Sequence, residues 1–349
     1  MRPVALALLA RGVTPSLIFT GQHGGLKPGD FGLDGFPAVR LDCPGREDPH
    51  DHVRAITLAM LPQLGNAPDL VLVQGDTSSA LGAALASFTA GVPVAHVEAG
   101  LRTHDPMLPW PEEEYRTAID ADADLLFAPT ELAAANLRGE QVPGEIHVTG
   151  NTGIDAVLDA MSRQPPTRRT GTGPRILVTC HRRESWGEGL SSIAAAVKEL
   201  AASGVAADVV LHPNAFVAAN MRRLLEGASK VTLVAPCSHD QLLLRMRDCD
   251  LILSDSGGIQ EEAPALGIPL LVLRDKTERP EGIAAGTAIL VGTDRARIVA
   301  EARRILDDAK TRAAMARQVF PFGDGKAGER IAAIVERWLF EKGTSRRLA

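Results

Sequence analysis

A Ser-Gly-Gly turn is the pattern in this sequence with the most specific chemical meaning. The apolar run 251–253 leads into Ser256, Gly257 and Gly258, and a helical pattern follows. Glycines let the backbone approach a ligand closely, and the amides at the start of a helix attract anions. We therefore predict a phosphate site here, with Glu262 one helical turn further on, where its carboxylate can accept hydrogen bonds from ribose hydroxyls. The alternative is a tight strand-to-helix turn that binds no ligand.

Carboxylates form a second group of candidates. Asp76 follows the apolar run 70–73, Glu98 follows the run 92–97, and Glu112 opens an acidic triplet behind a stiff Pro-Trp-Pro segment. If the two runs are neighbouring strands, Asp76 and Glu98 project from the same sheet edge. Converging carboxylates suit general acid–base chemistry. Two plainer interpretations stay open, in which Asp76 is a helix N-cap and the triplet is the charged first turn of a helix.

A third group is cationic. His181, Arg182 and Arg183 follow the apolar run 176–178 and form a compact positive group suited to a diphosphate or a departing phosphate. The charged segment 274–281 follows another apolar run and adds further candidate phosphate or base contacts. The alternative for both segments is a solvated, charged surface.

The elements that must position these groups are short apolar runs alternating with helical stretches. The runs are continuously apolar, which is typical of parallel strands covered on both faces. They lie at residues 17–19, 70–73, 92–97, 125–128, 146–148, 176–178, 209–211, 231–234, 251–253, 270–273 and 289–291. Helical patterns cover residues 78–90, 190–202, 241–247 and 326–342, and we expect a further buried helix near the N-terminus rather than a signal peptide. The fold class predicted is α/β with parallel sheets.

The length of 349 residues, about 2.3 times a typical domain, predicts two domains. The polar, Pro- and Gly-bearing segment 164–173 is the expected linker. It separates a Rossmann-like domain at 1–163, joined by the C-terminal helix 326–349, from a second at 174–325. Two doubly wound domains of this kind predict an active site in the cleft between them.

Composition excludes several other classes. A net charge of −6 and the lack of a basic face argue against a nucleic-acid partner. Four widely spaced cysteines predict free thiols in a reducing compartment rather than disulfides or zinc. No apolar run reaches the roughly 18 residues that span a membrane. We expect a cytoplasmic protein with no membrane contact and no metal.

Taken together, these motifs resemble the non-hydrolysing UDP-N-acetylglucosamine 2-epimerases, which share the GT-B fold of many glycosyltransferases. The matching stretches run in the family's order along essentially the whole chain. They are residues 74–77, 96–103, 109–113 with Arg116, 149–152, 181–185, 254–264 and 277–281.

The resemblance implies reversible inversion at C2 of UDP-N-acetylglucosamine, by elimination of UDP to a 2-acetamidoglucal and re-addition. It makes Asp76, Glu98 and Glu112 the acid–base candidates, and His181 a catalytic or phosphate-contacting group. The supporting arginines it implies are Arg116 and Arg2. The UDP-binding candidates are Arg182, Leu242, Ser256, Gly257, Gly258, Glu262 and Arg279. It implies UDP-N-acetylglucosamine or UDP as ligand, a homodimer, and no cofactor.

The sequence departs from the family pattern near its N-terminus. The family's first strand is expected to be missing, and Ala7 falls where the family has a lysine. Gln22, His23 and His212 match part of an allosteric site, but Gly24 and Gly25 replace larger side chains, so allostery is expected to be weak. The competing functions are a GT-B glycosyltransferase, a hydrolysing 2-epimerase, and a UDP-sugar binding homologue that lacks catalysis.

Overall fold

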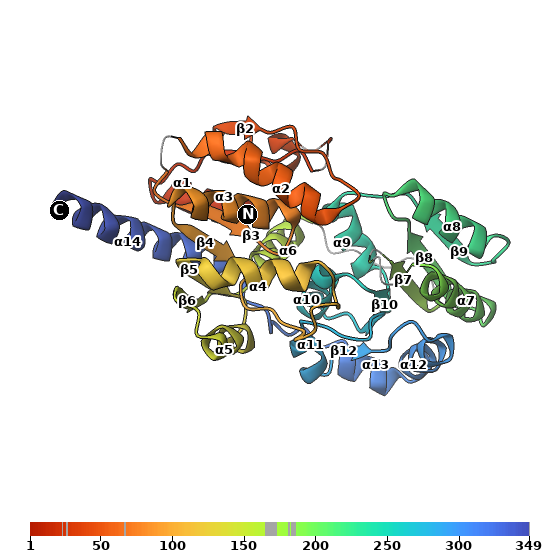
Figure 1. Cartoon of the computed structure of the whole chain (residues 1–349). Coiled ribbons are helices and arrows are strands. Elements are labelled where there is room, and N and C mark those ends of the chain that lie inside the picture. Colours follow the sequence, from red (N-terminus) through yellow and green to blue (C-terminus); the bar gives the residue numbers. More distant parts are fainter. Residues whose placement is uncertain are drawn as a thin grey trace. The chain divides into compact units, whose positions relative to one another are not determined.

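A computed structural model describes residues 1–22, 24–25, 27–65, 68–164, 173–180, 182 and 186–348. The chain forms two compact units, which are Met1–Ala156 with Phe322–Ala349 (unit 1) and Val157–Pro321 (unit 2) (Figure 1). The first boundary lies inside helix α6 (Thr152–Ser162). The linker predicted from the sequence lies later, at 164–173, and residues 165–172 of it lie outside the described part of the chain.

The main sheet of unit 1 has four parallel strands in chain order. These are β3 (Val71–Gln74), β4 (Val94–Val97), β5 (Leu125–Ala128) and β6 (Glu145–Val148). A separate parallel pair is formed by β1 (Leu17–Phe19) and β2 (Ala38–Arg40). Strand β2 is absent from the sequence prediction, because all three of its side chains are exposed and no apolar run marks it. Strand β4 begins only at Val94, after Pro93, since proline has no N–H to donate to a sheet.

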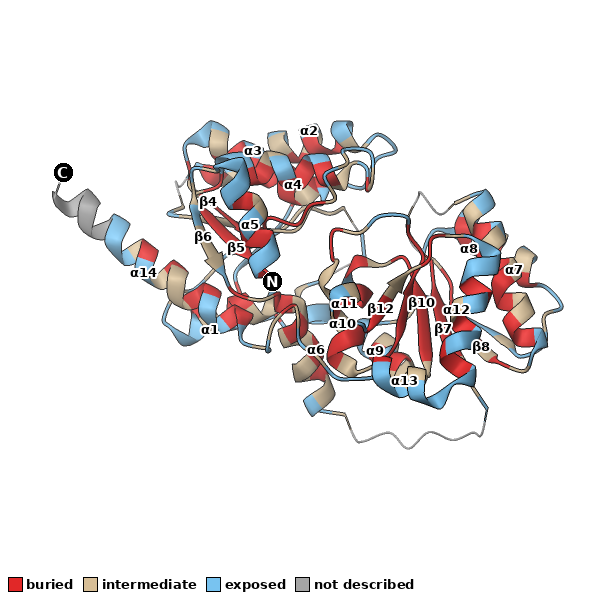
Figure 2. Ribbon diagram, turned by 90° about the horizontal axis from the view of Figure 1, so that it is seen from below, coloured by how far each residue is buried: buried red, intermediate tan, exposed pale blue. Residues whose placement is uncertain are grey.

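Helices cover both faces of this sheet (Figures 1 and 2). One apolar core joins the sheet to α2 (Pro49–Met60), α3 (Ser78–Ala90), α4 (Glu112–Asp122) and α5 (Glu131–Glu140). A second core joins its other face to α1 (Arg2–Ala10) and α14 (Ala327–Leu348). The 3-10 turns η1 (Pro28–Phe31) and η2 (Leu61–Leu64) complete unit 1. The expected N-terminal helix is therefore present, and it buries one side through Val4, Ala5 and Leu8.

Unit 2 contains one six-stranded parallel sheet in the order β12-β11-β10-β7-β8-β9. The strands are β7 (Arg175–Thr179), β8 (Ala206–Val210), β9 (Val231–Val234), β10 (Leu251–Ser254), β11 (Leu270–Val272) and β12 (Ala288–Leu290). The chain starts in the middle at β7, runs outward to β9, and returns to continue from β10 to β12. The strand order therefore reverses between β7 and β10, and ligands of open α/β sheets bind at such a reversal.

Two apolar cores sandwich the sheet of unit 2. On one face lie α7 (Glu188–Ala202), α8 (Ala215–Leu225), α12 (Arg295–Asp307) and α13 (Ala309–Met315). On the other lie the end of α6, α9 (His239–Arg247), α10 (Gly257–Leu266) and α11 (Glu281–Ala284). Figure 2 shows the buried strands β7 and β10 between these helices. The predicted α/β architecture with two Rossmann-like parallel sheets is confirmed.

Two kinds of feature are absent from the described residues. None of the helices described there is both long and apolar enough to cross a membrane. Nor does that part of the chain bring together three His, Cys, Asp or Glu side chains in a way that could hold a metal ion.

Candidate active site

The two predicted carboxylates of unit 1 leave neighbouring strands at the same sheet edge. Strands β3 and β4 are paired in parallel, with Gln74 opposite Val97, and Asp76 and Glu98 follow directly. The N-cap of α3 is Thr77, whose side chain accepts the N–H of Ala80. The N-cap interpretation of Asp76 is therefore wrong, and its carboxylate serves another partner.

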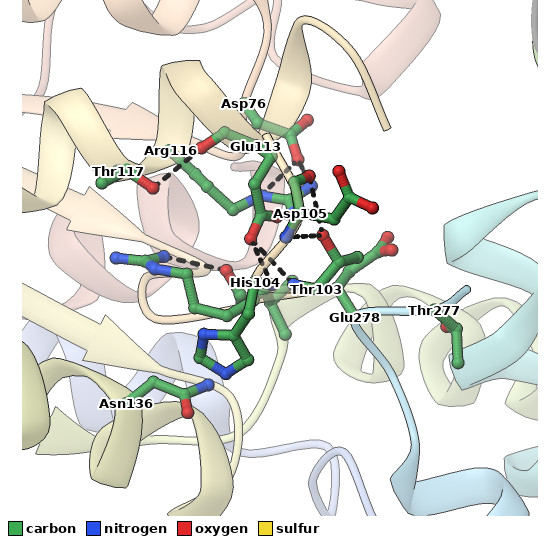
Figure 3. A network of polar contacts seen from close by, with 12 residues as sticks. Asp76, Thr103, His104, Asp105, Glu113, Arg116, Thr117, Asn136, Thr277 and Glu278 are labelled. Carbon is green, nitrogen blue, oxygen red and sulfur yellow. Dashed lines mark hydrogen bonds and ion pairs between the residues drawn. The ribbon is translucent and has the colours of Figure 1, made fainter. Parts of the chain in front are cut away.

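That partner is Arg116 of α4, whose side chain is only 1% exposed (Figure 3). Its Nε donates to Asp76 Oδ2 at 3.1 Å, and its Nη2 also pairs with this oxygen. Its Nη1 donates to Glu113 Oε2 at 2.6 Å. Arg116 thus holds the Asp76 carboxylate in place and leaves the group of three with one net negative charge.

Glu113, which the sequence analysis passed over in favour of Glu112, is the buried member of the acidic triplet. Its Oε1 accepts the backbone N–H groups of Thr103 at 2.8 Å and His104 at 2.9 Å (Figure 3). It therefore anchors the loop that follows Glu98 to α4. The three-residue spacing from Glu113 to Arg116 was the available signal, because such pairs meet on one helix face. Glu112 lies in the first turn of α4, as the plainer interpretation expected, and is partly exposed.

Glu98, directly after β4, has a strained backbone conformation. Its φ is +74°, which non-glycine residues rarely adopt, and strain of this kind gathers at functional sites. A Cβ placed on Gly75 would lie 3.6 Å from Glu98 Oε2, so this carboxylate lies beside the residue that directly precedes Asp76. Gln74 Nε2 also donates to Glu98 Oε2, at 3.5 Å. Two carboxylates are thus held side by side at the ends of β3 and β4.

A buried ionic network lies behind these carboxylates. His96 Nδ1 contacts Asp120 Oδ1 at 2.6 Å, and Asp120 Oδ2 pairs with Arg102 Nη2 at 2.8 Å. Burial raises the pKa of Asp120, but the charges and hydrogen bonds of His96 and Arg102 outweigh burial and hold that pKa below its ordinary value. Asp120 Oδ2 also accepts the N–H of Gly100 at 3.0 Å. Only glycine fits at position 100, where φ is +80° and a Cβ would lie 2.3 Å from the Ala133 carbonyl oxygen.

In unit 2 the predicted anion site lies at the strand reversal. The ends of the adjacent strands β7 and β10 are joined by a hydrogen bond of 2.7 Å between the hydroxyls of Thr179 and Ser254. The backbone N–H of Arg182 donates to Asp255 Oδ2 at 3.0 Å. Asp255 is fully buried and was not predicted as a site residue. The sheet thus brings the loop after β7 and the turn after β10 together, where the topology rule places a ligand.

The Ser-Gly-Gly turn begins α10, with Ser256 at the N-cap and Gly257 and Gly258 in the first turn. Gly257 lies under Arg279, since a Cβ there would be 2.8 Å from Arg279 Nη1. Arg279 itself is buried, and its Nε donates to Glu261 Oε1 at 2.6 Å while Nη1 pairs with Glu278. The guanidinium of Arg279 is therefore anchored by two carboxylates and packs against the turn. At a helix start the first backbone N–H groups have no partner within the helix, which leaves them for an anion.

Glu262 lies beside this turn, where a Cβ on Gly258 would be 3.8 Å from its Oε1, and it is also linked to α9. His239 Nε2 donates to Glu262 Oε1 at 2.8 Å, which links α9 to α10. This hydrogen bond raises the pKa of His239 above its ordinary value, against the opposing effect of partial burial. Leu242, also on α9, packs partly buried against the core under the sheet. His239 was not predicted, because its contact with Glu262 spans 23 positions and leaves no periodic signal in the sequence.

The remaining predicted residues divide between the units. In unit 1, Arg2 lies on α1 with its Nε near Gly32, and Gln22 Oε1 accepts from Ser79 on α3 at 2.6 Å. Ala7 packs against the core between α1 and the sheet. In unit 2, His212 Nδ1 accepts the N–H of Asn214 at 2.9 Å. His23, His181 and Arg183 lie outside the described residues.

Comparisons with known proteins agree with one another over most of the chain. Residues 7–336 match the family described as UDP-N-acetylglucosamine 2-epimerase. The chain is 45% identical over 280 residues to UDP-N-acetylglucosamine 2-epimerase of Salmonella typhimurium, which covers 76% of this chain and 74% of the relative. It is 44% identical over 279 residues to the Escherichia coli K12 enzyme of the same name, with the same coverage.

A solved structure extends the match to the fold. The crystal structure of UDP-GlcNAc 2-epimerase from Neisseria meningitidis bound to UDP-GlcNAc superposes with a TM-score of 0.91 and 35% identity, covering 97% of this chain and 96% of that one. This likeness confirms the predicted GT-B fold. The chain belongs to the UDP-N-acetylglucosamine 2-epimerase family, whose members are isomerases.

Proposed function

We propose that this protein reversibly converts UDP-N-acetylglucosamine into UDP-N-acetylmannosamine through a 2-acetamidoglucal. The observation that carries the proposal is the pair of carboxylates, Asp76 and Glu98, held side by side on adjacent strands. Inversion at C2 requires removing a proton from one face of the sugar and adding one to the other. Two or more positioned carboxylates meet that requirement.

The proposed elimination step balances as follows. A carboxylate takes the proton from C2, and the C–H electron pair forms the C1=C2 double bond. The bond between C1 and the phosphate oxygen breaks, and UDP leaves with its electron pair. In the return step a proton is added to the opposite face of C2, and the UDP oxygen attacks C1. Asp76, Glu98 and Glu112 are the candidates for these transfers, with Arg116 holding Asp76.

Unit 2 is proposed to hold the UDP part of the substrate. The first amides of α10, at Gly257 and Gly258, together with the Ser256 hydroxyl at the N-cap, suit the diphosphate, and the Glu262 carboxylate suits the ribose hydroxyls. Arg182 and Leu242 are proposed as further contacts. Because Arg279 is anchored to Glu261, we propose that it supports the turn from behind as well as contributing positive charge.

The other assignments rest on the family membership. Arg2 is proposed to contact the substrate, and His181 to act in catalysis or bind phosphate. Gln22, His23 and His212 are proposed as remnants of an allosteric site. The family also favours a homodimer.

Proton NMR of UDP-N-acetylglucosamine in D₂O with the purified protein tests this function. The C2 proton signal should disappear while the manno epimer appears. Appearance of free N-acetylmannosamine would instead show that the protein is a hydrolysing 2-epimerase.

One alternative has a specific observation in its favour. Ala7 stands where the resemblance places a lysine, and it packs against the core. A protein that binds UDP-sugars without catalysis would therefore bind UDP but leave the NMR spectrum unchanged.

A further inference from the structure

His96 is a buried histidine in the middle of an apolar strand, and the proposed acid–base chemistry does not use it. Its side chain is fully buried on β4. Its Nδ1 lies 2.6 Å from Asp120 Oδ1, and its Nε2 lies 3.0 Å from the carbonyl oxygen of Gly75. When Asp120 is ionised, both ring nitrogens therefore face oxygen atoms that accept hydrogen bonds and cannot donate them.

These two contacts determine the protonation of the ring. A neutral imidazole has one N–H donor and one acceptor nitrogen, so a neutral His96 would direct a lone pair at an acceptor oxygen. Only the doubly protonated ring donates to both partners. The charge is balanced locally, because Asp120 also pairs with Arg102, whose Nε donates to Glu140 Oε1 at 2.7 Å. These four side chains then carry two positive and two negative charges.

His96 and Asp120 each bind a backbone group close to one of the two proposed acid–base residues, Asp76 and Glu98. Gly75 directly precedes Asp76, and its own N–H donates to the Val97 carbonyl at 3.0 Å. With His96 holding its carbonyl, Gly75 is fixed from both sides. Asp120 Oδ2 meanwhile holds the N–H of Gly100, two residues beyond Glu98.

We propose that His96, kept doubly protonated by Asp120, is a positioning residue that holds Asp76 and Glu98 in reacting geometry. The inference rests on the proposed function for the reaction, but its statement about the ring holds independently. Misplacing a reacting group by about 1 Å can lower a rate by roughly 100-fold. Because the hydrogen-bonded His96–Asp120 ion pair fixes both backbones, we expect it to raise the rate of the reaction.

Nitrogen-15 NMR of the wild-type histidines at neutral pH tests the protonation. The groups that face His96 are the Asp120 carboxylate of α4 and the Gly75 carbonyl, with Arg102 and Glu140 of α5 behind Asp120. We expect both His96 nitrogens to carry a proton, because both face acceptor oxygens. His52 is the matched control, because it is buried in the same unit with Nε2 3.1 Å from the Cys43 carbonyl. A neutral pattern at His96 would overturn the proposal.

Substitutions of His96 and His52 distinguish a positioning role in the reaction from a purely structural role. In His96→Gln the amide cannot donate to both partners, and we expect kcat for C2 exchange to fall by roughly 100-fold. The KM and the affinity for UDP should change little. His52→Gln removes a buried, carbonyl-bound histidine elsewhere, and it should lower the melting temperature without lowering kcat. Equal kcat in His96→Gln and wild type, or an equal fall in both variants, would refute the positioning role.

Asp120→Asn provides a second variant that keeps the histidine. Asn Oδ1 can still accept from Nδ1 but carries no charge, so we expect His96 to become neutral and exchange to slow as in His96→Gln. A ring that stays doubly protonated in this variant would count against the role given to Asp120. If the wild-type protein itself showed no C2 exchange, the proposed function would fail, while the NMR result would still decide the protonation of His96.

Discussion

The two candidate sites use different kinds of chemical group. In unit 1 the site rests on buried charged side chains, with Arg116 and the His96–Asp120 pair behind the carboxylates. In unit 2 the groups proposed to bind the anion are the backbone amides of a glycine turn at a helix start, with the buried Arg279 and its two carboxylates packed against that turn. The diphosphate remains an anion throughout the proposed reaction and gains a further negative charge when the C1–O bond breaks, so fixed amide dipoles suit it. Proton transfer requires groups that change charge, and these must be held by other charges.

This difference predicts that damage to the two sites will differ in kind. Changes in unit 1 should mainly alter rates and stability, because they disturb titrating groups and buried ion pairs. Changes in unit 2 should mainly alter affinity for UDP. The four predictions below test this division, from the largest expected effect to the smallest.

The largest effect is expected from Asp76→Asn. The amide keeps an oxygen that Arg116 can contact, but it cannot take a proton from C2. We expect the rate of C2 hydrogen exchange, measured by NMR in D₂O, to fall by about 1,000-fold. The affinity for UDP, measured by calorimetry, should be unchanged.

Asp51→Asn is the control for that experiment, since Asp51 lies in the first turn of α2 and is exposed. It should leave both quantities as in wild type. A large fall in UDP affinity in Asp76→Asn alone would contradict the division of labour between the units.

The next effect concerns stability. Arg116→Met would leave the carboxylates of Asp76 and Glu113 facing each other without their shared cation. Breaking a buried ion pair in this way costs about 3–5 kcal/mol of unfolding free energy. Urea unfolding followed by circular dichroism measures it. Arg138→Met is the matched control, because Arg138 pairs with Glu131 at 3.6 Å on the surface of the same unit and should cost at most about 1 kcal/mol. Similar losses in the two variants would show that Arg116 is not the buried anchor described above.

The sequence predicted the unit 2 site better than the unit 1 site. The Ser256–Gly258 turn depends on contiguous residues, and both its place after a strand and its helix start were predictable from local pattern. The side-by-side placement of Asp76 and Glu98 was predictable too, because consecutive parallel strands end at one edge.

The support behind Asp76 was not predictable from local pattern. Arg116 reaches Asp76 across 40 positions and His96 reaches Asp120 across 24, so neither contact leaves a periodic signal. The acidic triplet shows the same limit. Its helical first turn was foreseen, but which glutamate faces inward depends on the phase of α4, which places Glu113 and not Glu112 against Arg116. A histidine inside the apolar run 92–97 was the one local hint, since a buried polar group must find partners.

The third prediction compares two neighbouring glycines of the unit 2 turn. In Gly257→Ala the new Cβ meets the guanidinium of Arg279, which Glu261 and Glu278 hold in place, so the turn must shift. In Gly258→Ala the Cβ finds its nearest neighbour, Glu262 Oε1, at 3.8 Å, which is ordinary contact. We expect Gly257→Ala to lower the melting temperature and Gly258→Ala to keep or raise it, because alanine favours helix by up to about 1 kcal/mol.

Both substitutions should weaken UDP binding, by about tenfold for a loss of roughly 1.4 kcal/mol. In Gly258→Ala the weaker binding would come only from the contact between the new methyl group and the ligand, since the free protein accommodates this group. Unchanged UDP affinity in Gly258→Ala would show that the diphosphate does not bind at this turn, whatever the result for Gly257→Ala.

The smallest effect concerns the one titrating pair of the unit 2 site discussed above, His239 and Glu262. The pKa of His239 is raised in the folded protein, chiefly by its hydrogen bond to Glu262. A raised folded-state pKa means that the stabilisation is fully present below the unfolded value of about 6.5 and is lost as the pH rises through the folded value. The effect should be small, because the His239 side chain is 44% exposed and solvent screens the pair.

Melting curves of wild type and His239→Gln between pH 5.5 and pH 9 would detect it. Glutamine keeps a donor for Glu262 but does not titrate, so the difference in melting temperature between the two proteins should shrink as the pH rises. A difference that stays constant with pH would mean that the contact with Glu262 does not raise the pKa of His239 in the folded protein. The unit 2 site would then rest on backbone dipoles and fixed charges alone, and its contrast with unit 1 would be sharper than the structure implies.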